Sequence, residues 1–179
     1  MFAIVDLEST GGKPADDRIM EIAIVIHDGQ KIIDEFESLI NPERDIQEFV
    51  QRLTGIKGSM VNKAPKFSAL AKEIDSRTHD CIFVAHNVGF DYRMVRSAFT
   101  RHNLSYMRPT LCTVKLAQAL MPASEKYNLD HLCQSLNIDN TSRHRAMGDC
   151  RATAELLHHI IKSYGMQAVM NHVEGGVRA

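Results

Sequence analysis

The first forty residues show apolar runs that predict three strands, over residues 2–6, 19–27 and 31–40. The last two are joined across "HDGQ", residues 27–30, whose Asp-Gly pair is a hairpin signal. We therefore expect an antiparallel meander. Beyond residue 41 the spacing of apolar residues becomes helical, which predicts that helices cover this sheet.

The rest of the chain alternates short strands with helices. Residues 81–85 form a continuous apolar run, typical of a strand buried on both faces, and "RPTLCT" predicts a brief further strand. Helical spacing is found over residues 46–53, 67–74, 91–102, 114–121, 129–136 and 145–164. The pattern predicts an α/β fold with a mixed five-stranded sheet flanked by helices. We expect one domain over residues 1–165, with residues 166–179 as an extension that frays at "EGGVRA".

The composition is that of an ordinary globular domain, with 44% hydrophobic and 24% charged residues among 179. Neither a membrane-spanning apolar run nor a leader pattern is present, so we expect a cytoplasmic protein with no membrane partner. The four cysteines are widely spaced, which favours buried, reduced thiols. A net charge of −1 argues against a protein that wraps long nucleic acid, so a polyanion should be bound locally.

Several acidic residues stand where side chains should point inward. Asp6 and Glu8 alternate along the first strand and therefore share one of its faces. Asp149 lies seven positions before Leu156 and continues the buried stripe of the last helix, and Asp91 opens its own helix in the same way. Each acid alone is also explained by solvent at a strand end or by the helix dipole.

Convergence of these four acids at one edge of the sheet would be costly. Two unit charges about 4 Å apart repel by about 4 kcal/mol at an effective dielectric constant near 20. Divalent cations offset this repulsion, and a set of carboxylate oxygens favours magnesium or manganese over zinc. The acids therefore predict a metal site.

His144 in "SRHRAMGD" stands five residues before Asp149, in the loop or first turn that leads into the last helix. A two-metal phosphodiester site needs a group that deprotonates water, and imidazole suits neutral pH. Most of the nine histidines should be structural. His86, which directly follows a strand, is expected to bond backbone at the strand end.

Three segments resemble the motifs of one nuclease family. "VDLESTGG" resembles D-x-E-[ST]-T-G, "VAHNVGFDYRMV" resembles A-H-N-x-x-F-D, and "HRAMGD" resembles H-R-A-x-x-D. These are the motifs of the DEDD 3′-5′ exonucleases of the His-containing subclass (DEDDh), on the ribonuclease H-like fold. "YNLDHLC" is similar to a further family stretch. The resemblance spans nearly the whole chain, and it is strongest to the epsilon proofreading subunits of bacterial DNA polymerase III.

The resemblance implies roles for individual residues. Asp6, Glu8, Asp91 and Asp149 would hold two divalent cations, Mg²⁺ or Mn²⁺, and His144 would be the general base. Leu7, Ser9 and Thr10 would line the pocket of the terminal nucleotide, Phe90 would pack against its sugar or base, and Ile56 would be an apolar wedge. For Phe90 and Ile56 ordinary core packing is an equal alternative. Candidate phosphate contacts are Arg93, Arg96, Lys126, Arg143 and Arg145.

The implied function is removal of mononucleotides from the 3′ end of single-stranded or frayed DNA, as in proofreading. One alternative is an RNA-trimming enzyme similar to oligoribonuclease or ribonuclease T. Another is a non-catalytic module that docks on a DNA polymerase or a nucleic acid end, although such a module has no physical need of His144 and all four acids. The sequence leaves open DNA against RNA, a polymerase partner and the oligomeric state.

Overall fold

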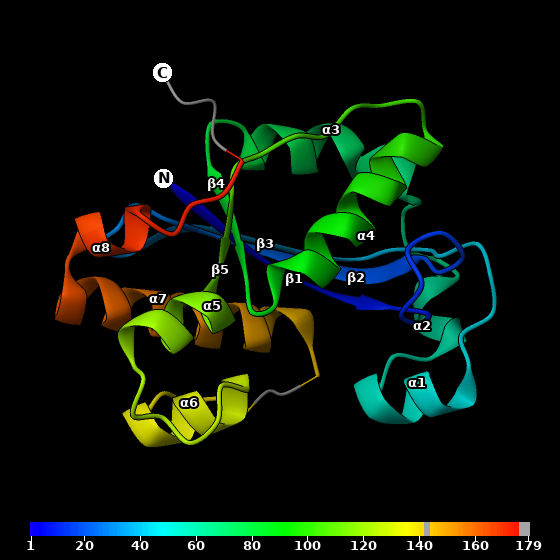
Figure 1. Ribbon diagram of the computed structural model, residues 1–179. Helices are drawn as coiled ribbons and strands as arrows, with labels where there is room; N and C mark the ends of the chain where they lie inside the picture. Colours follow the sequence, from blue (N-terminus) through cyan, green and yellow to red (C-terminus); the bar gives the residue numbers. More distant parts are fainter. Residues whose placement is uncertain (142–143, 176–179) are drawn as a thin grey trace.

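The computed structural model describes residues 1–141 and 144–175. Five strands form one sheet in the order β3-β2-β1-β4-β5, with helices on both sides (Figure 1). This confirms the predicted α/β fold with a mixed five-stranded sheet. The elements are β1 (Phe2–Ser9), β2 (Ile19–His27), β3 (Ile32–Leu39), α1 (Glu48–Thr54), α2 (Gly58–Val61), α3 (Phe67–Thr78), β4 (Ile82–Ala85), α4 (Val88–Arg101), β5 (Thr110–Cys112), α5 (Thr113–Leu120), α6 (Leu129–Leu136), α7 (Ala146–Tyr164) and α8 (Met166–Met170).

The strand pairing combines the predicted meander with two parallel strands. β1 is antiparallel to β2 and β2 to β3, whereas β1–β4 and β4–β5 are parallel. The hairpin between β2 and β3 turns at Gly29, whose φ of 99° suits a residue without Cβ. β1 continues to Ser9, three residues beyond the prediction, so Asp6 and Glu8 lie within the strand rather than at its end.

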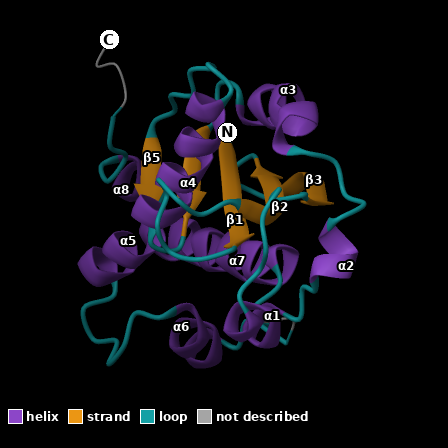
Figure 2. Cartoon of the chain, turned by 90° about the vertical axis from the view of Figure 1, so that its right-hand side faces the viewer, coloured by secondary structure: helices purple, strands orange, loops and turns teal. Residues whose placement is uncertain are grey.

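Two hydrophobic layers cover the faces of the sheet, and residues of β1 alternate between them. Ala3, Val5 and Leu7 join the cluster under α3 and α4, while Phe2 and Ile4 join the cluster that contains α5, α6 and α7. Figure 2 shows the sheet between these two groups of helices. Every residue of β2 is buried, as expected for a strand covered on both faces.

Most predicted helices are confirmed, with changes at their ends. α4 begins at Val88, three residues early, because Asn87 takes a left-handed conformation with φ 74° that turns the chain directly from β4 into the helix. The inward stripe predicted for residues 46–53 is only partly right, since Phe49 and Leu53 are 54% and 55% exposed. Among the described residues no helix is long and apolar enough to span a bilayer.

The segment after Gly165 is more ordered than the sequence indicates. It forms the short helix α8, whose Val169 is fully buried in the cluster with α7. Glu174, expected to begin a frayed end, forms an antiparallel bridge with Thr110 at the edge of β5, through two backbone hydrogen bonds of 2.8 Å. As far as residue 175, this extension is part of the packed fold.

All four cysteines are buried free thiols, as the sequence predicts. Cys150 on α7 donates a hydrogen bond from Sγ to the carbonyl oxygen of Ile4 on β1, at 3.0 Å. This contact joins the start of the last helix to the middle of the central strand. Burial raises the pKa of the Cys150 thiol, which keeps it protonated.

Candidate active site

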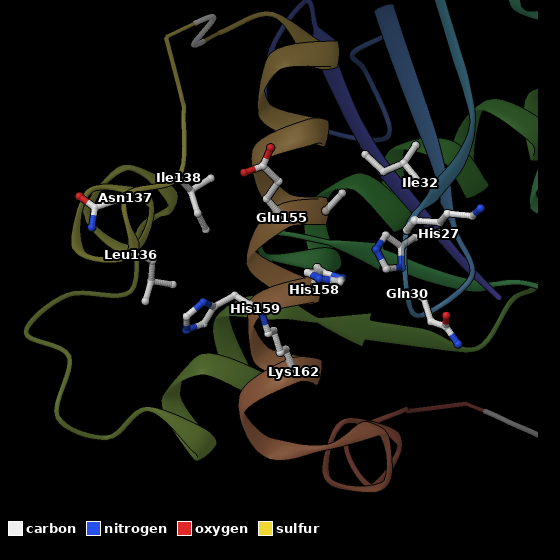
Figure 3. A pocket seen from close by; sticks show the side chains of 12 residues that line it. His27, Gln30, Ile32, Leu136, Asn137, Ile138, Glu155, His158, His159 and Lys162 are labelled. Carbon is white, nitrogen blue, oxygen red and sulfur yellow. The ribbon is translucent and has the colours of Figure 1, made fainter.

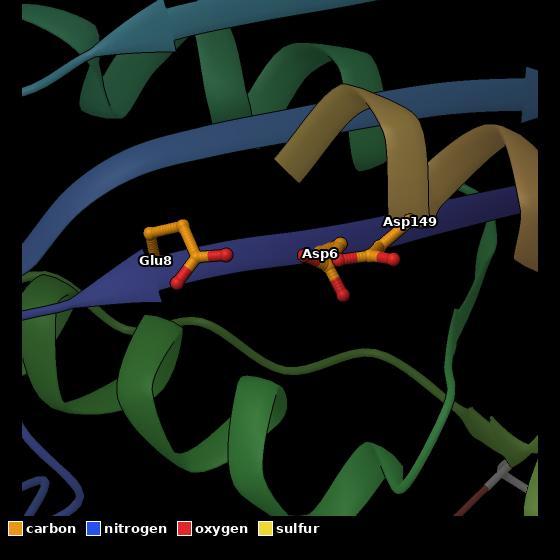
Figure 4. Close-up of side chains that lie close together, drawn as sticks. All are labelled: Asp6, Glu8 and Asp149. Carbon is orange, nitrogen blue, oxygen red and sulfur yellow. The ribbon is translucent and has the colours of Figure 1, made fainter. Parts of the chain in front are cut away.

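Three carboxylates meet where α7 begins above β1. Asp6, Glu8 and Asp149 each place one carboxylate oxygen so that all three oxygens lie within 4.8 Å of one another. Figure 4 shows the three side chains on the same side of β1, with Asp149 reaching down from the helix toward Asp6. The predicted sharing of one strand face by Asp6 and Glu8, and the inward direction of Asp149, are both seen.

The register of the sheet leaves this part of β1 open on one side. β1 pairs with β4 only from Phe2 to Ile4, so Asp6 and Glu8 lie beyond the last paired residue of β4. The chain turns there into α4, whose first turn carries Asp91. The carboxyl ends of two parallel strands thus bring a second helix start to the same edge.

Asp91 lies beside the three-carboxylate group without belonging to it. Its side chain is buried, and the backbone N–H groups of Asp91 and Leu7 face its carboxyl group. Among the neighbouring charges, that of Asp91 has the largest effect on Asp6. The structure therefore brings together all four acids that the sequence singles out.

The acids are held where their charged forms are unfavourable. Burial, followed by the charges of Asp91 and Asp149, raises the pKa of Asp6 well above its ordinary value. Burial and the charge of Asp149 raise the pKa of Glu8 to about 7. Burial also raises the pKa of Asp91 to about 8. Clustered acids with raised pKa values are typical of functional sites.

This donor set fits divalent cations. The group contains oxygen ligands alone, which suits hard cations such as magnesium and manganese better than zinc. A bound cation would offset both the burial of negative charge and the repulsion, which together raise the pKa values of Asp6, Glu8 and Asp91. We therefore take Asp6, Glu8, Asp91 and Asp149 as the residues able to hold metal.

His144 stands in the turn that leads into α7. Its backbone N–H donates to Oδ2 of Asp149 at 3.0 Å, so the carboxylate that joins the metal group also closes the turn that carries the imidazole. His144 has a φ of 56°, a left-handed conformation that is uncommon for residues other than glycine. Such strain is often found at functional sites.

Glu21 on β2 is a charged residue of this region that the sequence analysis missed. Its carboxylate is fully buried and accepts hydrogen bonds from Arg145 Nε at 3.0 and 3.1 Å, Arg145 Nη2 at 2.6 Å and the backbone N–H of Ala146 at 3.0 Å. A signal was present, because a lone Glu in the apolar run "IMEIAIVIH" must find a partner when buried.

The guanidinium of Arg145 is engaged by Glu21 and lies 3.8 Å from Glu37, so the structure does not support its role as a phosphate contact. Of the other candidates, Arg93 and Lys126 are exposed, and Arg96 is exposed with its guanidinium 5.8 Å from the ring centre of Tyr92. Arg143 lies outside the described residues. Contact of Arg93, Arg96 and Lys126 with phosphate stays a prediction.

The residues expected to bind the terminal nucleotide differ in exposure. Ser9 and Phe90 are partly exposed, whereas Leu7 and Thr10 are buried, which leaves mainly backbone groups for contact with a ligand. Ile56 is fully buried in a cluster with Met20, Ile46, Val50 and Val61. For Ile56 this arrangement favours core packing over a wedge role.

The loop that follows β1, residues 10–18, is tied down by side chains. Thr10 Oγ1 donates to Asp17 Oδ1 at 3.0 Å, and the backbone N–H of Lys13 donates to Asp17 Oδ2 at 2.9 Å. Carbonyl oxygens of the loop accept hydrogen bonds from Arg18, Arg44, Ser97 and Arg101. The loop is thereby fixed to the second half of α4.

His86 has the structural role that the sequence predicts. Its Nε2 lies 2.9 Å from the carbonyl oxygen of Tyr127, and its Nδ1 lies 3.0 Å from Thr113 Oγ1. Burial lowers the pKa of this imidazole. His86 therefore ties the end of β4 to α5 and to the segment before α6.

A separate cavity of about 440 Å³ lies along the second half of α7 (Figure 3). There the rings of His27 and His158 lie with their centroids 5.5 Å apart and their planes tilted by 59°. His158 stands about 14 Å along the helix axis from Asp149, at 1.5 Å per residue. The cavity is therefore distinct from the acidic group. Its lining residues are His27, Gln30, Lys31, Ile32, Leu136, Asn137, Ile138, Ala154, Glu155, His158, His159 and Lys162.

Comparison with known families assigns the chain. The model of the RNase_T family, described as exonuclease, matches residues 3–157, which includes all four acids and His144. The chain belongs to this exonuclease family. Its fold is the ribonuclease H-like fold of the DEDDh exonucleases. The more specific likeness to the epsilon subunit stays a prediction.

The curated relatives are much longer than this chain. The 3′-5′ exonuclease DinG of Staphylococcus aureus (strain USA300) is 36% identical to it over 157 residues, and the match spans 87% of this chain. DinG of Staphylococcus aureus (strain COL) matches to the same extent. The matched part is only 18% of the length of these relatives.

Solved structures of nucleases share the fold. Exonuclease X, solved in complex with 5′ overhanging duplex DNA, is similar at a TM-score of 0.74 and 30% identity, with 94% of this chain and 95% of that chain covered. E. coli exonuclease I in complex with a dT13 oligonucleotide has a TM-score of 0.79 at 20% identity, over 90% of this chain and 41% of that chain. The nuclease domain of 3′hExo, a DEDDh member bound to rAMP, has a TM-score of 0.82 at 16% identity, over 98% of this chain and 96% of that chain.

Proposed function

We propose that this exonuclease removes mononucleotides from the 3′ end of single-stranded or frayed DNA, by metal-dependent hydrolysis with His144 as the general base. The observation that supports this most is the group of Asp6, Glu8 and Asp149, with oxygens within 4.8 Å of one another and Asp91 beside them. The pKa values of Asp6, Glu8 and Asp91 are raised, and Asp149 lies beside them. Bound cations would stabilise the charged forms of such a cluster.

Magnesium or manganese would be held by Asp6, Glu8, Asp91 and Asp149. When bound, a pair of such cations supplies positive charge that polarises the scissile phosphodiester and stabilises the attacking and leaving oxygens. Hydrolysis adds water across the P–O3′ bond, so that the mononucleotide leaves with a 5′ phosphate and the shortened strand has a new 3′ hydroxyl. The chemistry acts on the backbone, which carries no sequence information.

His144 would accept the proton of the attacking water. The bond from its backbone N–H to Asp149 ties the backbone of this residue to one of the proposed metal ligands. The positive φ of His144 turns the chain sharply before α7. Partly exposed Ser9 and Phe90 would meet the terminal nucleotide, with the backbone of β1 beside them.

DNA as the substrate is supported by the relatives. Exonuclease X and exonuclease I were solved with DNA, and the curated relatives carry the name of a 3′-5′ exonuclease. A role in proofreading, with a DNA polymerase as partner, is part of the same proposal. Trimming of RNA 3′ ends is the alternative that the substrate comparison below separates.

Degradation of 5′-labelled oligonucleotides tests the proposal. We expect Mg²⁺- or Mn²⁺-dependent shortening of single-stranded DNA from the 3′ end, slower shortening of matched duplex than of duplex with a 3′ mismatch, and no shortening in EDTA. Asp6→Asn keeps the shape of the side chain but loses a ligand charge, so it should abolish cleavage. Asp80→Asn is the matched control, because Asp80 is exposed and its φ of 57° suits asparagine.

Several results would contradict parts of the proposal. Faster shortening of a matched RNA oligonucleotide would identify an RNA-trimming enzyme. Binding of single strands without any metal-dependent release of nucleotides would identify a docking module. Cleavage by Asp6→Asn at the rate of Asp80→Asn would remove the acidic group from the mechanism.

A further inference from the structure

We infer that Glu21 is a positioning residue, which sets the places of His144 and Asp149 by holding Arg145 and Ala146, the first two of the four residues between them. The inference rests on the proposed exonuclease function. Glu21 comes from β2 and contacts the chain at Arg145 and Ala146, which directly follow His144. None of these bonds involves Asp6, Glu8, Asp91 or Asp149, the four acids proposed to hold metal.

The carboxylate of Glu21 is fully buried and is satisfied by one short segment. Both of its oxygens accept from Arg145 Nε, one also accepts from Arg145 Nη2, and the other accepts from the backbone N–H of Ala146. Bidentate arginine–carboxylate pairs are strongly directional. A buried charge that loses such partners has no alternative in the core, so the segment cannot shift while Glu21 stays in place.

Glu21 also serves as the N-terminal cap of α7. Ala146 is the first residue of the helix, and its N–H is one of the donors that have no partner inside a helix. Within the described residues, the N-cap residue Arg145 makes no side-chain hydrogen bond to the helix. The cap comes instead from a neighbouring strand, and this fixes the helix start relative to the sheet.

The position of Glu21 in the sheet links this cap to the metal group. Its Cα partner across β1 and β2 is Glu8, and cross-strand partners place their side chains on the same face. The cap therefore holds α7 directly over the strand that carries Asp6 and Glu8. Because the N–H of His144 binds Asp149, a shift of Arg145 would move both residues together. Displacements of about 1 Å lower catalytic rates strongly.

Glu21→Gln tests the inference, because it keeps the size of the side chain and one acceptor while removing the charge. For cleavage of single-stranded DNA we expect kcat to fall by about 10- to 100-fold, as for other residues that orient metal ligands, with KM changed less than twofold. Calorimetry should show Mn²⁺ affinity weakened by about tenfold. Arg145→Lys, which keeps the charge but not the bidentate geometry, should show the same two effects to a smaller extent.

Glu35→Gln is the matched control. Glu35 on β3 also forms a bidentate pair with an arginine of α7, through Arg151 Nε at 2.8 Å and Nη2 at 2.5 Å, but this pair is exposed and lies beyond Asp149 on the helix. Glu35→Gln removes the same kind of bond between the sheet and the same helix. We expect kcat and Mn²⁺ affinity to stay within twofold of the unmutated protein.

A folded Glu21→Gln protein with kcat and Mn²⁺ affinity within twofold would overturn the inference, and so would equal losses in Glu35→Gln. If Glu21→Gln fails to fold, the same criteria apply to Arg145→Lys. An increase in KM with kcat unchanged would indicate a substrate contact and would also overturn the inference. Absence of nuclease activity in the unmutated protein would count against the proposed function, while the comparison of Mn²⁺ affinities would still decide the role of Glu21.

Discussion

At the scale of single residues, the candidate site is a group of acids whose charged forms are unfavourable in the folded protein. Burial and mutual repulsion raise the pKa values of Asp6, Glu8 and Asp91, and bound cations would reverse the effect. Burial and crowding make these charges costly in the metal-free protein, and the proposed cations would offset that cost.

Substitution of His144 tests the proposed general base. His144→Asn keeps the backbone N–H that binds Asp149 and suits the positive φ, so the turn should survive. Turnover should fall by about 10² to 10⁴-fold, which is what a general base contributes. Steady-state kinetics on single-stranded DNA, with Mn²⁺ affinity and melting temperature as controls, measure this. Turnover within threefold of the unmutated protein would exclude the role.

At the scale of elements, the end of β1 and its loop have little freedom. Asp17 is 6% exposed and its carboxylate binds Thr10 and Lys13. A Cβ added at Gly11 would lie 2.6 Å from Asp17 Oδ2, whereas one added at Gly12 would meet nothing within 4 Å. Of the two adjacent glycines in "STGG", Gly11 is therefore required by close packing against Asp17, whereas Gly12 is not.

Gly11→Ala should accordingly destabilise the protein by about 1–3 kcal/mol, the usual cost of overpacking, because Asp17 must leave its hydrogen bonds to make room. Gly12→Ala should change the free energy of unfolding by less than about 0.5 kcal/mol. Urea denaturation of both variants provides the comparison. Equal stability of the two proteins would show that Asp17 moves aside without loss.

At the scale of the whole molecule, the acidic group links stability to pH and metal. The pKa values of Glu8 and Asp91 are about 7 and 8, and that of Asp6 is also raised. All three pKa values are higher than in an unfolded chain. Raised acid pKa values stabilise the fold at low pH, and this contribution is lost as pH rises through the folded-state values. Imidazoles with lowered pKa values, His27 and His86, change stability only below about pH 6.5.

We therefore expect the melting temperature of the metal-free protein to fall between pH 7 and 8.5. Mg²⁺ should raise the melting temperature more at pH 8.5 than at pH 7, because the ligands must lose protons to bind it. In Asp6→Asn both trends should be weaker. Scanning calorimetry in EDTA and in Mg²⁺ measures this, and a metal-free melting temperature that rises over this range would refute the electrostatic account.

Local pattern was sufficient for much of the architecture. The meander, the buried run of β4 and the stripe of α7 follow from periodicity, which depends on neighbours in sequence. The acids and His144 were identified because each occupies an unusual place in such a pattern or in a family motif. Phe49 and Leu53 show the limit, since their spacing is helical but both side chains are exposed in the folded protein.

What the sequence by itself determined is the five strands, the longer helices and the candidate acids of the site, because these are recorded in short stretches of chain. Tertiary structure alone decided how far β1 extends past β4, how the end after Gly165 packs, and that Glu21 holds Arg145 across a separation of 124 residues. These depend on which surfaces meet once the chain is folded, and periodicity carries no information about contacts so distant in sequence.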